Sequence, residues 1–272
     1  MSSRLDTEMV RRGLAPSREQ AQRLIKMGQV SVDGSPASKP SVPVTPENAI
    51  TLTGEGLPFV SRGGLKLQRA LELFPITLAG LTCADIGAST GGFTDCMLQH
   101  GAGKVYAIDV GTGQLHPSLL VDPRVVNMEQ TNIREVESLP EEPRFISADV
   151  SFISLRLVLP VIARLLPEGG EAVVLVKPQF EAGKGAVGKN GVVKDPKTHL
   201  QVLRAVKGYA LENGFALCGA GFSPIRGPEG NIEYLYWLRK GEDRGDVPDT
   251  ALRQLAEASH QALPSRQKRK RR

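Results

Sequence analysis

Apolar and polar positions along the chain follow two alternating patterns from residue 81 onward. Short apolar runs are separated by longer segments in which apolar residues recur every three or four positions, as expected for strands and amphipathic helices. The alternation predicts an α/β fold with a mostly parallel, doubly wound sheet. A Gly/Pro-rich loop and no helix joins the last two strands, so the final strand should be antiparallel. The predicted strands are 81–86, 104–108, 124–127, 144–149, 171–177, 215–222 and 232–239, and the predicted helices are 93–99, 154–166 and 196–213.

The N-terminal segment has a different organisation, with two short helices before any strand. The first helix ends at Gly13, and a capping box of Ser17 and Gln20 opens the second, which Gly28 closes. A stretch rich in Pro, Gly, Ser and Thr follows, and a helix to about Phe74 then opens the larger domain. The predicted elements are helices over 4–13 and 17–28 and strands over 30–32 and 49–53. The predicted domains are a small α+β domain over 1–55, a linker over 56–62, the α/β domain over 63–248, and a C-terminal helix with a basic tail over 249–272.

The net charge of +5 is unevenly distributed. Residues 1–40 carry seven Lys/Arg against four Asp/Glu, and residues 266–272 carry six against none, whereas the chain between them is net acidic. Basic ends indicate a polyanionic partner. The basic residues of the helix pair could follow a phosphate backbone, although a solvated charged face is equally compatible with the pattern. These residues are Arg11, Arg12, Arg18, Arg23 and Lys26.

Composition argues against several classes of protein. Three scattered cysteines, without C-x-x-C or His pairing, indicate neither a disulfide framework nor a zinc site. The first residues lack the apolar core of a signal peptide, and the most apolar stretch, 155–166, is interrupted by charged residues and a proline. We therefore expect a cytoplasmic protein without a transmembrane span or a bound metal.

A glycine-rich turn connects the strand that ends at Ile86 to the helix that starts near Phe93. Its glycines allow positive φ and close approach of a ligand to the helix N-terminus. Its spacing is neither G-x-G-x-x-G nor that of a P-loop, which argues against both a dinucleotide-binding turn and a P-loop that binds phosphates. Carboxylates at Asp85 and Asp109 suit S-adenosylmethionine, which has a cationic amino group and a ribose but no phosphate. Ordinary α/β turns would leave the same pattern. The predicted cofactor-binding residues are Asp85, Gly87, Ser89, Gly91, Gly92, Phe93, Asp109 and Glu129.

Four ionisable residues lie where an α/β sheet builds its site, at or beside the carboxyl ends of strands. They are Lys66, Asp149, Lys177 and Glu233. A lysine that ends a buried strand is costly unless it has partners. Lys177 could instead reach the surface and pair there with Asp149. Lys66 and partial burial favour the neutral amine of Lys177, whereas the two carboxylates favour its charged form, and the sequence leaves both open.

The N-terminal segment resembles the small RNA-binding domain named after ribosomal protein S-four. The resemblance covers about residues 3–53 and rests on 17–21, on Gly28 and on 30–34. It implies that RNA is bound through the basic helix pair.

The four strand-end residues resemble the Lys-Asp-Lys-Glu tetrad of the FtsJ-like ribose 2′-O-methyltransferases. Further motifs, in family order, are similar to those of the TlyA family, whose members are often labelled hemolysin A. The matching stretches are 60–64, 87–94, 149–155, 177–184 and 230–234. The resemblance implies S-adenosylmethionine-dependent methylation of ribosomal RNA on cytidine 2′-hydroxyls, without a metal. A membrane-active hemolysin and a noncatalytic ribosome-binding factor are the alternative functions.

The resemblance also implies roles for the tetrad. Lys177 would accept the proton of the ribose hydroxyl, with Asp149 and Glu233 orienting it. Asp149 could instead steer the positive methyl donor, and Lys66 could hold the ribose or a phosphate. A glycine-rich segment over 183–191 is either a mobile loop over the site or an ordinary surface loop. The tail, 266–272, should be disordered and either adds RNA affinity or only aids solubility.

Overall fold

The computed structural model describes residues 2–26, 29–37, 39–52, 58–188, 190–241 and 246–263. The chain divides into two compact units, residues 1–58 and 59–272. Gly28, part of the proposed linker, and the tail over 266–272 lie outside the described residues. The domain limits at 55, 62 and 248 remain predictions.

The small unit has the predicted α+β character. Two helices, α1 (Leu5–Arg11) and α2 (Arg18–Lys26), pack over a core that includes Leu5, Met9 and Ile25. A three-stranded antiparallel sheet has the order β3-β2-β5, and β1 pairs with β4. The strands are β1 (Ser3–Arg4), β2 (Val30–Val32), β3 (Ser35–Pro36), β4 (Pro43–Val44) and β5 (Ile50–Leu52). The two-residue strands were not predicted, because two residues are too few to show an alternating pattern.

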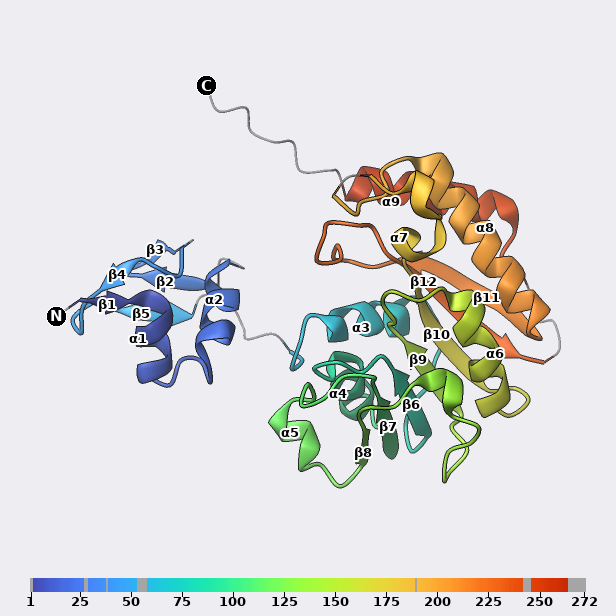
Figure 1. Cartoon of the computed structure of the whole chain (residues 1–272), viewed down its shortest axis with the longest axis horizontal. Coiled ribbons are helices and arrows are strands. Elements are labelled where there is room, and N and C mark those ends of the chain that lie inside the picture. The colour runs from blue at the N-terminus through green and yellow to red at the C-terminus, as the bar shows by residue number, and fades with distance from the viewer. Residues whose placement is uncertain are drawn as a thin grey trace. The chain divides into compact units, whose positions relative to one another are not determined.

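The large unit contains the predicted seven-stranded sheet (Figure 1). The strand order is β11-β12-β10-β9-β6-β7-β8. β12 is antiparallel to both neighbours and the other pairings are parallel, which confirms the reversed last strand. The strands are β6 (Thr82–Ile86), β7 (Lys104–Ile108), β8 (Val125–Met128), β9 (Phe145–Ala148), β10 (Glu171–Val176), β11 (Phe215–Phe222) and β12 (Tyr234–Lys240).

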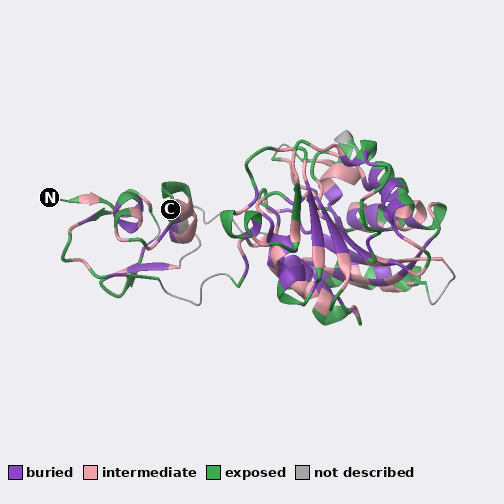
Figure 2. Cartoon of the chain, turned by 90° about the horizontal axis from the view of Figure 1, so that it is seen from below, coloured by how far each residue is buried: buried purple, intermediate pink, exposed green. Residues whose placement is uncertain are grey.

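Helices cover both faces of this sheet because successive strand side chains point to opposite sides. In β6, Cys83 packs into the core beneath α3 (Gly63–Leu73) and α4 (Gly92–Gln99), whereas Ala84 and Ile86 belong to the core of the other face. The strands are consequently buried on both sides, as the purple ribbons through the centre of the unit in Figure 2 show. The opposite face carries α6 (Leu155–Leu165), α8 (Pro196–Glu212) and α9 (Asp249–Ala262), and the short elements are α5 (Pro117–Leu120), η1 (Ile133–Glu135), α7 (Pro178–Glu181) and η2 (Lys184–Ala186).

The strand register explains where functional side chains can meet. β6, β7, β9 and β10 are parallel, so their carboxyl ends lie at one edge of the sheet. Val176 at the end of β10 pairs with Tyr234 at the start of the antiparallel β12. Lys177 and Glu233 therefore lie at this same edge. None of the helices in the described part of the chain is both long and apolar enough to cross a membrane.

Candidate active site

The four ionisable residues grouped from the sequence meet at the carboxyl edge of the sheet. Asp149 lies at the centre: one carboxylate oxygen is 3.1 Å from Lys66 Nζ and the other is 2.5 Å from Lys177 Nζ. Glu233 Oε2 is 2.7 Å from Lys66 Nζ. Lys66 comes from α3, and the other three flank β9, β10 and β12. The geometry is thus a chain of alternating charges, with Glu233, Lys66, Asp149 and Lys177 in that order.

Burial makes these contacts strong. Lys66 and Lys177 are each 7% exposed and Glu233 is 1% exposed. Burial by itself disfavours the Lys66 ammonium, but attraction to Asp149 and Glu233 outweighs it and raises the pKa of Lys66 above its ordinary value. Burial likewise opposes the Asp149 carboxylate, yet the two lysines hold the pKa of Asp149 below its ordinary value. Lys66 and Asp149 are therefore both charged at neutral pH.

Ser151 and Phe152, which follow Asp149 closely in the sequence, complete the surroundings of Lys177. Neither was among the residues predicted for the site. Lys177 Nζ donates a hydrogen bond to Ser151 Oγ at 2.9 Å. Phe152 is 91% exposed and has a φ of +63°, in the left-handed region that non-glycine residues rarely adopt. Its ring centroid is 5.1 Å from that of Phe180, and Lys177 Nζ is 5.9 Å from the centre of the Phe180 ring. The sequence signals were their position just after Asp149 and their place in the stretch 149–155 that resembles the TlyA family, because neither exposure nor φ can be read from the residue types.

A carboxylate braces the two loops that carry these groups. Glu181, at the end of α7, accepts hydrogen bonds from Ser154 Oγ at 2.7 Å and from the Leu155 backbone N–H at 2.8 Å. Burial raises the pKa of Glu181 above its ordinary value, against the opposing effect of these donors. Because Ser154 also caps α6, this contact connects the segment after Lys177 to the segment after Asp149.

The glycine-rich turn lies directly against the tetrad. Gly87 has a φ of +81°, and a Cβ there would be 2.7 Å from the Asp149 carbonyl oxygen. Gly91 has a φ of +92° and precedes the first residue of α4, and a side chain there would meet Leu119. Gly92 leaves no room either, since a Cβ would be 2.3 Å from Ser61 Oγ. The turn therefore requires glycine for close packing, and that packing places it next to Asp149.

Asp85 is enclosed beneath this turn. It is 0% exposed and accepts hydrogen bonds from the Thr94 backbone N–H at 2.9 Å, the Thr94 hydroxyl at 2.7 Å and the Ser147 hydroxyl at 3.1 Å. Burial raises the pKa of Asp85 to about 7, although its donors act in the opposite direction. The side chain supports the turn and α4 from the interior, and its predicted contact with a cofactor remains a prediction.

Two other predicted cofactor residues organise the neighbouring loops. Asp109 accepts from the backbone N–H groups of Ser89 at 2.8 Å and Gly111 at 2.7 Å. Glu129 accepts from three backbone N–H groups, those of Gly113, Gln114 and Leu115, which lower the pKa of Glu129. Ser89 has a φ of +49°, and Phe93 is 3% exposed in the core. The carboxylates thus shape the rim after β7 and β8.

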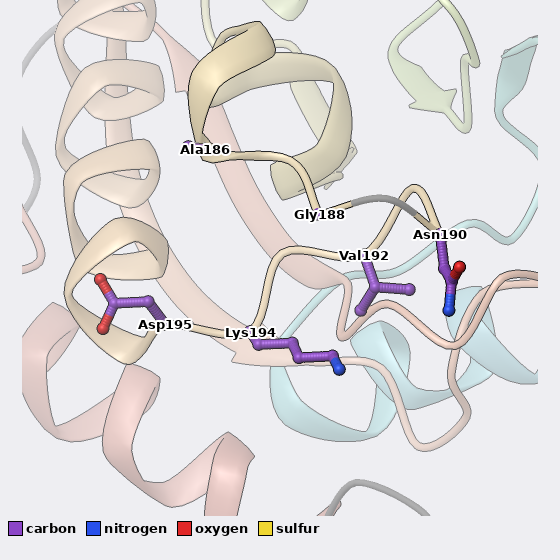
Figure 3. A pocket seen from close by; sticks show the side chains of 6 residues that line it. All are labelled: Ala186, Gly188, Asn190, Val192, Lys194 and Asp195. Carbon is purple, nitrogen blue, oxygen red and sulfur yellow. The ribbon is translucent and has the colours of Figure 1, made fainter.

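A cavity of about 370 Å³ lies along and just beyond the glycine-rich segment 183–191, which was predicted to be either a mobile loop over the site or an ordinary surface loop (Figure 3). Asn190, Val192 and Lys194 lie along one stretch of this loop, and Asp195 begins α8 beside it. Buried Asn231 holds the loop, because its side chain donates to the Gly191 carbonyl and accepts from the Val193 N–H. The cavity is lined by Ala186, Gly188, Asn190, Val192, Lys194 and Asp195. That this loop covers the site remains a prediction.

The basic helix pair of the small unit is tied to two buried carboxylates. Asp6 pairs with Arg18 at 3.3 Å, and Glu8 pairs with Arg11 at 2.6 Å and Arg12 at 2.7 Å. Arg11 and Arg12 hold the pKa of Glu8 well below its ordinary value. Hydrogen bonds from Arg4, Gln22 and Arg18 lower the pKa of Asp6 in the same way.

The predicted RNA-binding residues differ in exposure. Arg11 and Arg18 have side chains that are 63% and 55% exposed. Arg12 instead donates to the Thr45 and Asn48 carbonyls, which gives it an internal role. Arg23 is half-buried in α2, and the side chain of Lys26 lies outside the described residues. Their RNA contacts stay predictions.

The fold and this site define a methyltransferase. The sheet has seven strands with the last one reversed, and the tetrad adjoins the glycine turn at its carboxyl edge. Residues 59–240 match the FtsJ-like methyltransferase family, and residues 3–50 match the S4 domain. The chain belongs to the FtsJ-like methyltransferase family and carries an S4 domain before its catalytic unit.

Similar proteins match this chain over most of its length. A 16S/23S rRNA (cytidine-2′-O)-methyltransferase, TlyA, from Mycobacterium tuberculosis is 47% identical over 96% of this chain and 97% of that protein. Hemolysin A from Brachyspira hyodysenteriae is 40% identical over 85% of this chain and 98% of that protein. A solved structure described as a hemolysin from Streptococcus thermophilus is 44% identical, covers 96% of both chains and has a TM-score of 0.78.

Proposed function

We propose that this protein methylates the 2′-hydroxyl of cytidine in ribosomal RNA with S-adenosylmethionine as the methyl donor. The observation that carries the proposal is the buried chain of Glu233, Lys66, Asp149 and Lys177 beside the glycine turn. The relative from Mycobacterium tuberculosis, named for cytidine-2′-O-methylation of 16S and 23S rRNA, matches over both units and supports the substrate. Ribosomes are cytoplasmic, so the reaction would take place there.

The residues around the turn fit this cofactor by their chemistry. Neither 85–94 nor 109–116 contains a lysine or arginine, so no side chain there would favour a phosphate. Asp109 and Glu129 present carboxylates suited to ribose hydroxyls and to a cationic amino group. Gly87 and Gly91 supply the positive φ angles that let the turn pack closely and bring its backbone beside the start of α4, where the ligand would lie. When bound, S-adenosylmethionine supplies an electrophilic methyl group, whose carbon bonds to the ribose O2′ as its bond to sulfur breaks and that electron pair stays on sulfur.

The chain's own residues would prepare the hydroxyl. In its neutral form, Lys177 accepts the proton that leaves O2′ as the new bond forms, and thereby acts as the general base. Asp149 holds that amine in place and lies between it and Lys66. The ion pairs with Asp149 and Glu233 stabilise the charged form of Lys66. The field of Asp149 also favours the developing positive charge on Lys177. The exposed ring of Phe152 offers a stacking surface for the target base once it leaves its neighbours.

The small unit would supply RNA affinity. The side chains of Arg11 and Arg18 are largely exposed, yet each is held by a buried carboxylate that fixes its orientation. Arginine presents a planar fork of donors that matches a phosphate. Such contacts bind RNA without reading its sequence, so the catalytic unit would select the nucleotide.

Methyl transfer to isolated ribosomal subunits tests the proposal. Purified protein is incubated with S-adenosylmethionine labelled in its methyl group and with subunits that lack the modification. The RNA is then hydrolysed in alkali. A 2′-O-methyl group blocks attack of that oxygen on the adjacent phosphodiester, so the label should remain in alkali-resistant dinucleotides with cytidine at the 5′ side. Label in single nucleotides would indicate base methylation, and no transfer would favour a noncatalytic ribosome-binding factor.

A further inference from the structure

The ammonium group of Lys177 has two defined partners among the described residues. Its Nζ is 2.5 Å from Asp149 Oδ1 and donates to Ser151 Oγ at 2.9 Å. A lysine nitrogen has three positions for hydrogens or a lone pair besides its bond to carbon. Only the contact with Ser151 has hydrogen-bond geometry, whereas the contact with Asp149 is an ion pair. Ser151 therefore fixes one of the three positions, and the negative charge of Asp149 disfavours the lone pair on its own side.

We propose that Ser151 is a positioning residue that aims the lone pair of Lys177 at the ribose hydroxyl, an inference that rests on the proposed function. With the ion pair to Asp149 alone, the amine could turn about the Cε–Nζ bond. The hydrogen bond to Ser151 fixes one N–H, and the charge of Asp149 disfavours the lone pair on its own side, so one direction is left for the lone pair. When the hydroxyl proton arrives, the hydrogen bond and the ion pair both persist, so the site needs no rearrangement during the transfer.

The backbone that carries Ser151 is braced for such a role. On one side, Asp149 is fixed by its two lysines. On the other side, Phe152 holds a left-handed φ of +63°, and Glu181 ties the start of α6 to α7 through the Leu155 backbone N–H, a contact that does not depend on the Ser154 hydroxyl. Strained backbone of this kind persists where surrounding contacts impose it, and it is common at active sites. Ser151 itself is exposed, so its hydroxyl is not required to fill the core.

The charged groups around Lys177 come from four elements. Asp149 follows β9 and contacts the amine directly, whereas Lys66 of α3 and Glu233 before β12 act from behind Asp149. Glu181 of α7 is engaged with α6. None of these is altered when Ser151 is replaced, so a change in the pH profile would report on the missing hydroxyl.

Three single variants test the role. Ser151→Ala removes the hydroxyl, Ser151→Thr keeps it, and Ser154→Ala removes a hydroxyl from the same segment that caps α6 and never contacts Lys177. Each is measured for its single-turnover rate of methyl transfer between pH 6 and 9, for binding of S-adenosylmethionine and RNA, and for unfolding by the fluorescence of Trp237.

Ser151→Ala should lower the plateau rate about tenfold or more, the scale of one hydrogen bond to a charged group, while binding stays unchanged. The pH of half-maximal rate should move downward, because the charged amine loses an acceptor and the neutral form becomes easier to reach. Ser151→Thr should restore both quantities. Ser154→Ala should lower the unfolding midpoint and leave the pH of half-maximal rate at the wild-type position.

Different results separate the two proposals. A Ser151→Ala enzyme with the wild-type plateau and pH midpoint would overturn the role of Ser151 and leave the methyltransferase proposal intact. The same holds if Ser151→Thr is as slow as Ser151→Ala, or if the rate falls only in proportion to unfolded protein. Wild-type protein that transfers no methyl group would overturn both.

Discussion

Replacing Lys66 by methionine should leave the carboxylate of Glu233 buried without its cation. Glu233 is 1% exposed, and Lys66 is the only cation that the described residues place within ion-pair distance of it. Removing one partner of a buried pair typically costs about 3–5 kcal/mol, because the remaining charge keeps its desolvation penalty. In a unit of this size each 1 kcal/mol shifts Tm by roughly 2–4 °C, so Lys66→Met should lower Tm by about 10 °C.

A second substitution separates this effect from a general loss of packing. Glu233→Gln removes the stranded charge, so the double variant Lys66→Met/Glu233→Gln should recover much of the lost stability, although Asp149 still lacks one of its two lysines. Trp237, the only tryptophan of the chain, lies in β12 and reports unfolding of the catalytic unit by its fluorescence in urea. The reasoning fails if Lys66→Met costs less than about 1 kcal/mol, or if the double variant loses the sum of the two single losses.

Three further predictions concern the cofactor, the RNA and pH. Asp109→Ala should weaken binding of S-adenosylmethionine in titration calorimetry with little change in urea unfolding, and an unchanged affinity would remove Asp109 from the cofactor site. Arg18→Gln should reduce the slope of log Kd against log salt for RNA by about one unit for each phosphate that the arginine neutralises in the wild-type complex. The matched control Arg204→Gln, an exposed arginine of α8 that also pairs with an aspartate, should leave that slope unchanged. Asp85 has a pKa of about 7 in the fold against an ordinary 3.8, so the folded state binds its proton more tightly and stability should fall as pH rises from about 4 to 7. Asp85→Asn should therefore be more stable than wild type at pH 8, by up to about 4 kcal/mol, and equal stability in urea at that pH would contradict the raised pKa.

The sheet could be predicted because its information is local. Strands buried on both faces are apolar runs, and the missing helix before β12 was enough to predict its reversed direction. That reversal also brings Glu233 to the edge where Lys177 lies. Lys66 is different, because it belongs to a helix and not to a strand end. Its place beside the strand ends and the tetrad resemblance grouped it with the other three, but nothing in a helical segment predicts its contacts with Asp149 and Glu233.

Features that depend on exposure or on distant backbone contacts could not be predicted. Ser151 and Phe152 follow Asp149 in sequence. However, the residue types do not show that Phe152 has a φ of +63° or that the Ser151 hydroxyl accepts a hydrogen bond from Lys177. Asp85 lies near the end of β6 as expected, yet Ser147 on the adjacent strand and Thr94 enclose it. Arg12 belongs to a basic run, but its guanidinium is directed to three carbonyl groups of a neighbouring loop. Residue types give charge, whereas packing decides where that charge points.

The role of Lys177 as proton acceptor is the central claim, and single-turnover methyl transfer to ribosomal subunits tests it most directly. With enzyme in excess over subunits, wild type, Lys177→Ala and Lys177→Arg are compared after calorimetry shows that each binds S-adenosylmethionine. Both variants should be slower by a factor on the order of 10² or more, the usual scale for a lost general base. Arginine should not rescue, because its guanidinium stays protonated and cannot accept the proton. A near-normal rate for Lys177→Arg would contradict the account and reduce Lys177 to a positive charge that holds the substrate.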